Sequence, residues 1–325
     1  MREVHLINPF ENAFGGSELR TLSLASILEG VADVKLWSLG QPDSRLRSSR
    51  AIVPVDLAKA RFPRSGTFVF VGAYYPIPMW VSVARPERAV LVYNVPYAPH
   101  LRGNLQLLET YEVPRIDVVV AAESLATHSR ELGYEPTFEP SWIDFKRFAP
   151  IQSCPERPFT VGRHSRDVLE KFHEDDPALF LRLAEAGVRV RLMGATCIAG
   201  SMANHPNITI LPSGAMPPEK FLGGLDAFLY RTHDVWNEAW GRAVVEAVAM
   251  GIPTILDKRV GALEMLEGGD GALVFKDSEE AFAHVIRLRD DSDFARRLAE
   301  KAMAKLRRFY SSEVRRAIAD FYIKN

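Results

Sequence analysis

The sequence predicts an α/β protein built from two doubly wound domains and a C-terminal helical tail. Its 325 residues exceed the size of one typical domain. The composition, 47% hydrophobic and 25% charged, is that of a globular protein able to bury two cores. Short apolar runs alternate with helical patterns along most of the chain, which is typical of parallel sheets.

The first half opens with an apolar strand that is followed by Gly15-Gly16. A helix is expected next, with Ser17 as its N-cap and Gly30 as its stop. Another helix is expected over Glu123–Leu132. The expected strands are continuous apolar runs, as in strands covered on both faces; they are Val4–Ile7, Val34–Trp37, Phe68–Val71, Ala89–Tyr93 and Asp117–Ala121.

Four prolines between Pro140 and Pro158 mark the expected linker. The predicted domains are therefore 1–150 and 151–325, and the last helix can pack back on the first domain. Strands of the second domain are expected at Phe159–Val161, Arg189–Met193, Ile208–Leu211, Ala227–Tyr230, Pro253–Leu256 and Ala272–Phe275. Its helices are expected at Pro177–Ala186, Ala239–Met250, Ala262–Leu266, Ser278–Arg289 and, beyond Asp293, through Ser311–Tyr322. Ligands of such sheets bind beyond the carboxyl ends of the strands, here in a cleft between two facing sheets.

Composition excludes several classes of function. A net charge of -1 gives no sign of nucleic-acid binding. Cys154 and Cys197 show no metal-ligand or redox spacing, which favours unpaired thiols in a reducing cytosol. The N-terminus lacks the pattern of a signal peptide. An uncharged run over 67–84 is interrupted by Gly72, Pro76 and Pro78, so no membrane span is expected.

Two other signals concern metals and surfaces. Asp291-Ser292-Asp293 spells D-x-D, but it falls between two late helices, where an aspartate caps the second helix more readily than it binds a metal. Six basic residues against one acidic residue lie between Arg45 and Arg64, and nine against three lie over 294–325. Solvated loops and helix faces account for both. The alternative hypothesis is that the first patch faces an anionic lipid or a lipid-linked acceptor.

The most informative segment is Asn237–Ile255, NEAWGRAVVEAVAMGIPTI. Glu238 and Glu246 lie eight positions apart, which is about 12 Å along a helix. At that distance they can hold different parts of one elongated ligand. A carboxylate suits this role, since it accepts hydrogen bonds from vicinal hydroxyls. The alternative is an ordinary surface pair between Arg242 and Glu246 at i, i+4 spacing.

This segment resembles the E-x7-E motif of family 4 glycosyltransferases, which are retaining enzymes of the two-Rossmann GT-B architecture. Further similarities follow in the family's order over most of the chain. They are Gly15-Gly16-Ser17-Glu18 (G-G-x-E), PSWIDFKRFAP at 140–150, TVGRHSR at 160–166 (V-G-R-L), VGALEM at 260–265 (G-G-x-x-E) and GALVF at 271–275. The family's G-F-G is Ala239-Trp240-Gly241 here, and its Pro-Ser is replaced by Tyr230-Arg231-Thr232, so the sugar pocket is expected to differ in shape.

The resemblance implies roles for individual residues. Glu246 would bind the donor ribose, and Glu238 would bind the hydroxyls of the transferred sugar. Arg163 would neutralise the departing diphosphate together with a lysine, for which Lys171 is the first choice and Arg166 a close competitor. The remaining implied positions are the backbone N–H groups of Gly261, Ala262 and Leu263 at the diphosphate, Gly15 and Gly16 in the first domain, and either His100 or Asn94 at the sugar.

The resemblance also implies the reaction. It would be a metal-independent hexosyl transfer with retention, from a UDP or GDP sugar to a glycan or lipid-linked acceptor. No resident cofactor is expected. The place would be the cytoplasm, with peripheral contact at the inner face of the membrane, and the context would be cell-surface glycan or glycolipid assembly. Two alternatives stay open, namely an inactive relative that acts as an interaction protein and a GT-B sugar-nucleotide epimerase.

Overall fold

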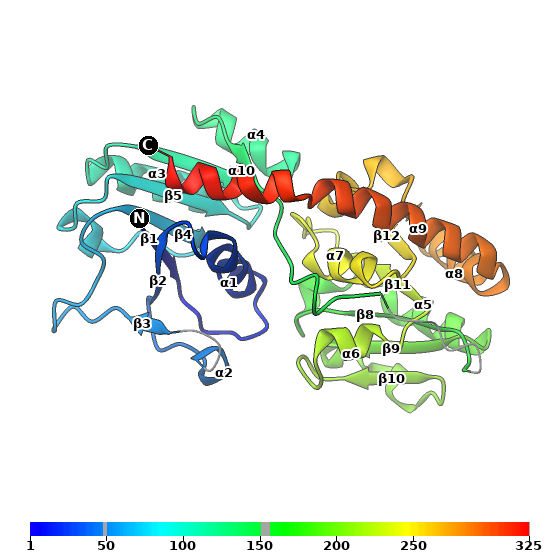
Figure 1. The fold of residues 1–325 in the computed structure, drawn as a ribbon. Helices are drawn as coiled ribbons and strands as arrows, with labels where there is room; N and C mark the ends of the chain where they lie inside the picture. The colour runs from blue at the N-terminus through cyan, green and yellow to red at the C-terminus, as the bar shows by residue number, and fades with distance from the viewer. Residues whose placement is uncertain (48–50, 151–156, 325) are drawn as a thin grey trace. The chain divides into compact units, whose positions relative to one another are not determined.

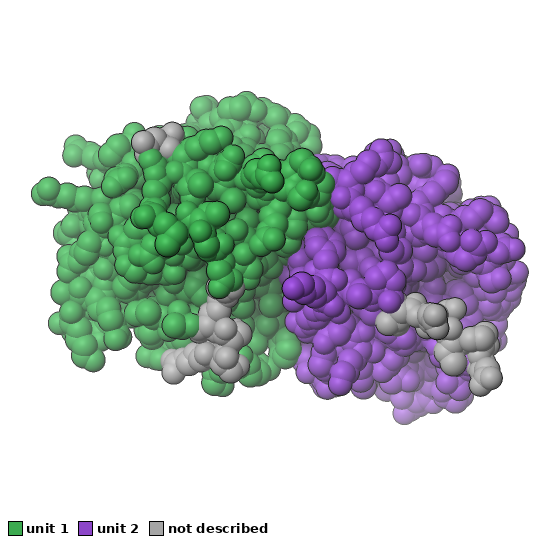
Figure 2. Space-filling model, in the orientation of Figure 1, with its two compact units in different colours: residues 1–142, 310–325 green, residues 143–309 purple. Residues whose placement is uncertain are grey.

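A computed structural model describes residues 1–47, 51–150 and 157–324 of the chain. The chain forms two compact units (Figure 2). Unit 1 comprises Met1–Trp142 together with Tyr310–Asn325, and unit 2 comprises Ile143–Phe309. The polypeptide therefore passes from unit 1 to unit 2 and back again. The change at Trp142 lies eight residues before the expected boundary, and Cys154 of the expected linker falls outside the described residues.

Unit 1 contains a sheet of seven parallel strands in the order β3-β2-β1-β4-β5-β6-β7 (Figure 1). The five strands predicted from apolar runs are all present. The two that were not predicted, β3 and β7, are edge strands too short for a hydrophobic pattern. The strands are β1 (Glu3–Asn8), β2 (Asp33–Ser38), β3 (Ile52–Pro54), β4 (Thr67–Gly72), β5 (Arg88–Tyr93), β6 (Ile116–Val120) and β7 (Thr137–Phe138).

Helices cover the unit 1 sheet. They are α1 (Gly16–Leu28), α2 (Ser44–Arg47), α3 (Ala98–Thr110), α4 (Glu123–Glu131), α10 (Ser312–Ile323) and the 3-10 helix η1 (Met79–Ser82). The last helix, α10, packs beside α1 (Figure 1) and buries Ile318, Ala319 and Tyr322 in the core built on β1 and β4.

The expected N-cap at Ser17 is wrong. Gly15 holds the N-cap position of α1, and Ser17 lies inside the helix. Its hydroxyl donates to the Val71 carbonyl at 3.1 Å and accepts from Asn8 Nδ2 at 2.7 Å. A tertiary contact to the sheet therefore replaces the local capping bond that the sequence suggested.

Unit 2 contains six parallel strands in the order β10-β9-β8-β11-β12-β13. All six were predicted, five with bounds within one residue, whereas β8 extends three residues beyond its predicted end at Val161. They are β8 (Thr160–His164), β9 (Arg189–Met193), β10 (Ile208–Leu211), β11 (Ala227–Tyr230), β12 (Thr254–Asp257) and β13 (Leu273–Phe275). The helices are α5 (Asp176–Glu185), α6 (Pro218–Leu222), α7 (Arg242–Ala249), α8 (Ser278–Asp290) and α9 (Ser292–Phe309), with short 3-10 turns η2 (Leu169–Lys171), η3 (Thr196–Ile198), η4 (Gly200–Asn204), η5 (Gly261–Leu263) and η6 (Glu267–Gly269).

Two expected helices of unit 2 are shorter than predicted. The helix expected from Ala239 begins at Arg242, because Gly241 adopts a left-handed conformation with φ of 82° that ends the preceding turn. The helix expected over Ala262–Leu266 is only the three-residue 3-10 turn η5. Both turns follow strands at the carboxyl edge of the sheet. The backbone at that edge is therefore made of loops and short turns where longer helices were expected.

The late D-x-D segment caps a helix as expected, because Asp291 Oδ1 accepts from the Phe294 N–H at 2.8 Å at the start of α9. Across the described ranges, no helix has the length and apolar character needed to cross a membrane.

Candidate functional site

Most of the sequence-predicted residues of unit 2 gather at the carboxyl edge of its sheet. Arg163 lies near the end of β8, and Lys171 ends the short turn η2 that follows. Glu238 lies in the loop between β11 and α7, whereas Glu246 lies inside α7. The parallel order of β8, β11 and β12 brings these loops together, as expected at the ligand-binding edge of a doubly wound sheet.

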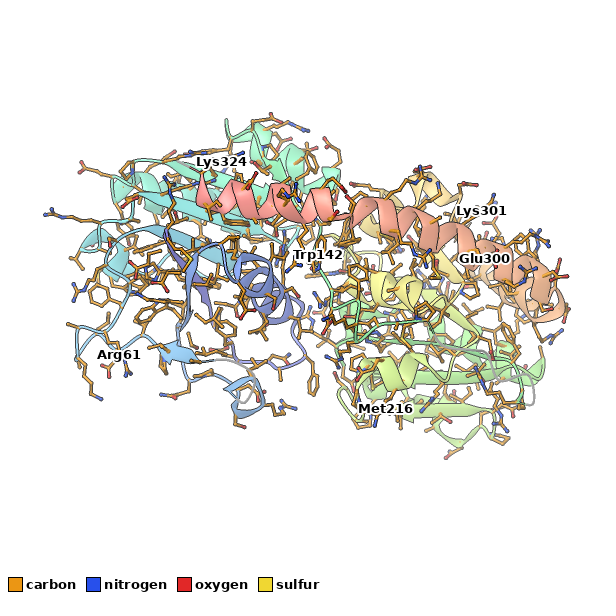
Figure 3. The ribbon with its side chains drawn as sticks, viewed as in Figure 1. Arg61, Trp142, Met216, Glu300, Lys301 and Lys324 are labelled. Atoms are coloured by element: carbon orange, nitrogen blue, oxygen red, sulfur yellow. The ribbon has the colours of Figure 1, made fainter. Side chains whose placement is uncertain are left out.

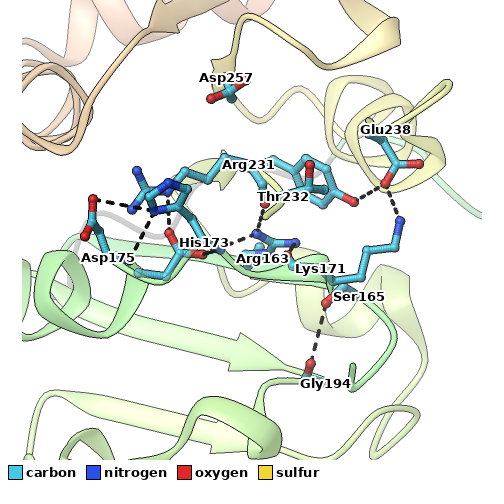
Figure 4. A network of polar contacts seen from close by, with 12 residues as sticks. Arg163, Ser165, Lys171, His173, Asp175, Gly194, Arg231, Thr232, Glu238 and Asp257 are labelled. Atoms are coloured by element: carbon cyan, nitrogen blue, oxygen red, sulfur yellow. Dashed lines mark hydrogen bonds and ion pairs between the residues drawn. The ribbon is translucent and has the colours of Figure 1, made fainter. Parts of the chain in front are cut away.

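Glu238 accepts two hydrogen bonds on one carboxylate oxygen. The Lys171 amine donates to Glu238 Oε2 at 2.5 Å, and the Tyr230 hydroxyl donates to the same oxygen at 2.6 Å. Figure 4 shows the Lys171 side chain reaching toward Glu238. Burial by itself raises the pKa of Glu238, but the charge of Lys171 and these hydrogen bonds outweigh it and hold the pKa below its usual value. The carboxylate is therefore ionised and fixed in one orientation.

Arg163 lies next to Lys171 and is 1% exposed. Its guanidinium lies 4.2 Å from the centre of the Tyr230 ring and 4.6 Å from that of Phe172. One amino group donates to the Lys171 carbonyl at 2.7 Å, and the other donates to the Arg231 carbonyl. Arg163 is thus bound to the backbone that carries Lys171, and its expected direct role at a diphosphate stays a prediction.

The buried ionic cluster of unit 2 has more cations than carboxylates. Asp176 pairs with Arg231 at 2.5 Å and with Arg163 at 3.9 Å, while Glu238 pairs with Lys171. These contacts join three cations to two carboxylates, an excess of one positive charge. Arg166 is exposed nearby, and its charge acts on Lys171 and Glu238. Lys171 and Arg166 were the two candidates for the family's lysine at the diphosphate. Lys171 is the one that pairs directly with Glu238.

Glu246 is also buried, and it contacts Arg242 and His164. Arg242 Nε lies 3.0 Å from Glu246 Oε1, and His164 Nε2 lies 3.3 Å from Glu246 Oε2. The side chains of Arg242 and Glu246 are 15% and 5% exposed, so the ordinary surface pair considered above is excluded. Burial raises the pKa of Glu246, but the contacts with His164 and Arg242 outweigh this, and the pKa lies below its usual value.

The turn at Gly261–Leu263 was expected to offer three backbone N–H groups to a diphosphate, but two of them already donate to carbonyls of the protein. Gly261 donates its N–H to the Glu238 carbonyl at 3.0 Å, and Leu263 donates to the Val260 carbonyl at 3.0 Å. Of the three expected backbone donors, Ala262 is therefore the one not engaged in these two bonds. Ala262 is not among the described non-glycine residues with positive φ, so it fits this turn without strain.

Gly261 is a required glycine for a different reason. A Cβ atom added there would lie 2.0 Å from the Ala239 carbonyl oxygen, which is a backbone atom that cannot move aside. The close approach and the bond from Gly261 to Glu238 fix the turn against the loop that carries the first carboxylate.

The candidate residues of unit 1 are described separately. Gly15 and Gly16 lead into α1, and a Cβ at Gly15 would lie 2.0 Å from Glu18 Oε2. His100 is exposed in the first turn of α3, with its ring 4.8 Å from that of Tyr97. Asn94 follows β5, and its side-chain oxygen accepts from the buried Arg20. Asn94, the alternative to His100, is thus the more firmly held of the two.

The sequence analysis assigned no role to His164 or Tyr230. In the structure His164 lies beside Glu246, and Tyr230 donates to Glu238. A signal for each was present. His164 directly follows Arg163 and occupies the leucine position of the V-G-R-L pattern, and Tyr230 begins the segment that departs from Pro-Ser. Both positions end a strand at the edge where ligands bind.

The basic segment between Arg45 and Arg64 is not a single uniform patch. Arg45 pairs with Asp43 at 2.6 Å, and Lys59 and Arg61 lie 3.3 Å and 3.8 Å from Asp56. Arg64 lies over the Phe62 ring at 3.8 Å. Asp43 and Asp56 therefore reduce the positive electrostatic field of this basic segment. Arg50 lies outside the described residues.

Comparison with known proteins agrees with this architecture. Residues 220–320 match a family model described as glycosyl transferase-like. The structure of Anabaena HepE in complex with UDP-glucose is similar over 99% of both chains, with a TM-score of 0.74 and 14% identity. A comparison with curated proteins finds no match.

Two further structures extend the likeness. A glycosyltransferase from Rickettsia africae matches over 100% of this chain and 99% of its own, with a TM-score of 0.73 and 14% identity. WaaG, a glycosyltransferase involved in lipopolysaccharide biosynthesis, matches over 99% of this chain and 100% of its own, with a TM-score of 0.70 and 12% identity. The chain therefore has the GT-B fold of these glycosyltransferases, and its residues 220–320 match the glycosyl transferase-like model.

Proposed function

We propose that this chain is a retaining glycosyltransferase that moves a hexosyl group from a nucleoside-diphosphate sugar to an acceptor hydroxyl without a metal ion. The observation that carries the proposal is the pair of carboxylates at one sheet edge, of which Glu246 is buried and Glu238 is half-buried. Glu238 and Glu246 lie eight positions apart along the chain, and each is paired with a cation, Lys171 and Arg242 respectively. One would bind hydroxyls of the transferred sugar and the other those of the ribose.

The charge balance supports a diphosphate between them. The cluster around Lys171 and Arg163 holds one cation more than carboxylates. A buried unmatched positive charge is costly, and an anionic ligand removes that cost. The Lys171 amine is the cation paired with Glu238, the proposed sugar-binding carboxylate, so we assign it to the leaving diphosphate.

In the proposed reaction the bond between the anomeric carbon and the diphosphate oxygen breaks. The acceptor oxygen bonds to the same face of that carbon, and its proton passes to the departing diphosphate. No carboxylate nucleophile is needed. The protein holds the transferred sugar and the ribose in place. It stabilises the charge that develops on the diphosphate through Lys171 and the turn at Ala262.

Donor and acceptor are proposed from the relatives. HepE is described in complex with UDP and with UDP-glucose, which favours a UDP sugar over a GDP sugar. WaaG is described as acting in lipopolysaccharide biosynthesis, which favours a glycan or lipid-linked acceptor in cell-surface assembly. The proposed place is the cytoplasm, with peripheral contact to an anionic membrane. Flotation with anionic vesicles at low salt tests that contact, and absence of binding there would contradict it.

The main experiment compares two arginine–glutamate pairs of the same spacing. Arg242–Glu246 is largely buried on α7, whereas Arg296–Glu300 is exposed on α9 (Figure 3 labels Glu300). Thermal shift is measured for the wild type, Glu246→Ala and Glu300→Ala with UDP, GDP, ADP and CMP. We expect one nucleoside diphosphate to stabilise the wild type and Glu300→Ala but not Glu246→Ala.

Two outcomes of this thermal-shift screen would contradict the proposed site. No shift of the wild type with any diphosphate would contradict a donor site of this kind. A shift that survives in Glu246→Ala would remove Glu246 from the site. Product formed only when an acceptor is supplied would then separate a transferase from an epimerase.

A further inference from the structure

His164 is a largely buried polar residue with aromatic neighbours. It is the last residue of β8, and its side chain is 12% exposed. The Phe221 and Phe228 rings each lie 6.1 Å from its ring, in edge-to-face arrangements. A leucine, as in the V-G-R-L pattern, would suit such surroundings without the cost of burying an imidazole. Packing alone therefore does not account for a histidine here.

The feature that a histidine adds is its contact with Glu246. Nε2 lies 3.3 Å from Glu246 Oε2, on the side of the carboxylate opposite to the Arg242 contact at Oε1. Arg242 Nε therefore donates to one oxygen, while the His164 imidazole lies against the other. Each carboxylate oxygen has room for a second donor, so both can still accept a hydroxyl.

The alignment of this contact is incomplete. Nε2 is buried, and among the described residues it has no acceptor that meets hydrogen-bond geometry, Glu246 included. The two atoms are close but not collinear with an N–H. A small rotation of the carboxylate, as a ligand engages it, would complete the bond.

We propose that His164 is a positioning residue of the nucleotide site, which orients Glu246 so that its two oxygens accept the vicinal hydroxyls of a ribose. The ligand class is a nucleoside diphosphate with both hydroxyls intact. This inference rests on the proposed function, and it adds that the strength of ribose recognition depends on His164. Arg242 alone holds only one of the two oxygens.

The test measures affinity by calorimetry for UDP and for 2′,3′-dideoxy-UDP, or for the GDP or ADP pair if the thermal screen selects that base. The proteins are wild type, His164→Leu, His164→Gln and a matched control, His284→Leu. His284 lies on α8 of the same unit and contacts the Val274 carbonyl. Thermal unfolding without ligand confirms that each variant is folded.

We expect His164→Leu to weaken binding of the ribonucleotide about tenfold, as for a hydrogen bond to a charged group. Binding of the dideoxy analogue should change little, because it lacks the hydroxyls that Glu246 would receive. His164→Gln keeps a donor and should lie between wild type and His164→Leu. His284→Leu should bind both ligands as the wild type does. If His164→Leu does not fold, the comparison rests on His164→Gln.

Two results would overturn the inference. Equal weakening of both ligands would mean that His164 supports the site only through packing. An unchanged preference for the ribonucleotide in both His164 variants would mean that it plays no part in ribose recognition. Failure of the wild type to bind any nucleoside diphosphate is distinguishable from both, because it removes the proposed function itself.

Discussion

The two units each bury an arginine with a carboxylate and a tyrosine, but they balance the charges differently. In unit 1, Arg20 donates to Glu139 at 3.1 Å, and the Tyr322 hydroxyl donates to the other Glu139 oxygen at 2.6 Å. One cation faces one carboxylate. In unit 2, Tyr230 donates to Glu238 at the same distance of 2.6 Å, yet three cations there face two carboxylates.

The difference separates a structural network from a site. The unit 1 network joins α1, the end of the sheet and α10, and its one cation is paired with its one carboxylate. The unit 2 cluster lies at the ligand edge with a positive charge left over. Similar side chains and similar burial thus give opposite expectations, because a balanced pair needs no ligand and an unbalanced cluster favours an anion.

The largest effect on activity is expected for Lys171→Met. This change removes the cation beside Glu238 and brings the unit 2 cluster to two cations against two carboxylates. We expect kcat/KM for sugar transfer to fall about 10³-fold, the loss typical of one group that stabilises developing charge. Steady-state kinetics with the donor found in the thermal screen measures it. Turnover within a few-fold of the wild type would exclude Lys171 from the reaction.

A comparable change in unit 1 should affect stability. Arg20→Met leaves Glu139 buried without its cation, and we expect the free energy of unfolding to fall by about 3 kcal/mol. Denaturant unfolding measures this loss, and nucleotide affinity of the folded protein should not change. Adding Glu139→Gln should restore part of the stability, because the uncompensated charge is then gone. A specific loss of nucleotide binding in Arg20→Met would contradict the structural role given to this network.

The smallest effect is expected from a matched pair of hydroxyl deletions, Tyr230→Phe and Tyr322→Phe. In unit 2, the Tyr230 hydroxyl helps to hold the pKa of Glu238 below its usual value. Without it that pKa rises, so Glu238 becomes protonated at a higher pH as the solution is acidified. We expect kcat/KM to fall about fivefold, in line with one hydrogen bond, and the acid limb of the pH–rate profile to move to higher pH.

Tyr322→Phe serves as the control for that shift. It removes a hydroxyl with the same 2.6 Å bond to a buried carboxylate, but in unit 1. We expect a lower melting temperature and an unmoved acid limb. An acid limb that moves equally in both variants would show that the profile reports folding, and the assignment of Glu238 as the titrating group would then be lost.

Local patterns predicted the fold because its strands are buried on both faces. The run Phe68–Val71 and the run Ala89–Tyr93 are continuously apolar, and each is a central strand of the unit 1 sheet. The spacing of Glu238 and Glu246 likewise indicated two separate carboxylates. Short edge strands such as Ile52–Pro54 gave no comparable signal, since three residues cannot establish a period.

What the sequence could not predict depends on distant neighbours. The burial of Arg163 follows from Tyr230, which lies 67 positions along the chain and covers its guanidinium. The contact of His164 with Glu246 joins a strand end to a helix interior. The left-handed Gly241 shortened a helix that its composition favoured. None of these follows from propensity or periodicity, because each is set by packing between separate elements.

The return of the chain to unit 1 at Tyr310 has a consequence for biosynthesis. Unit 2 is one continuous stretch, whereas unit 1 lacks Ile318, Ala319 and Tyr322 of its core until the final helix has left the ribosome. The usual order, in which the N-terminal domain folds first during synthesis, is therefore not open to this protein in full. The first 142 residues would wait with an incomplete core while the later unit completes its own fold, because the part of α1 that α10 covers stays exposed until α10 has been made.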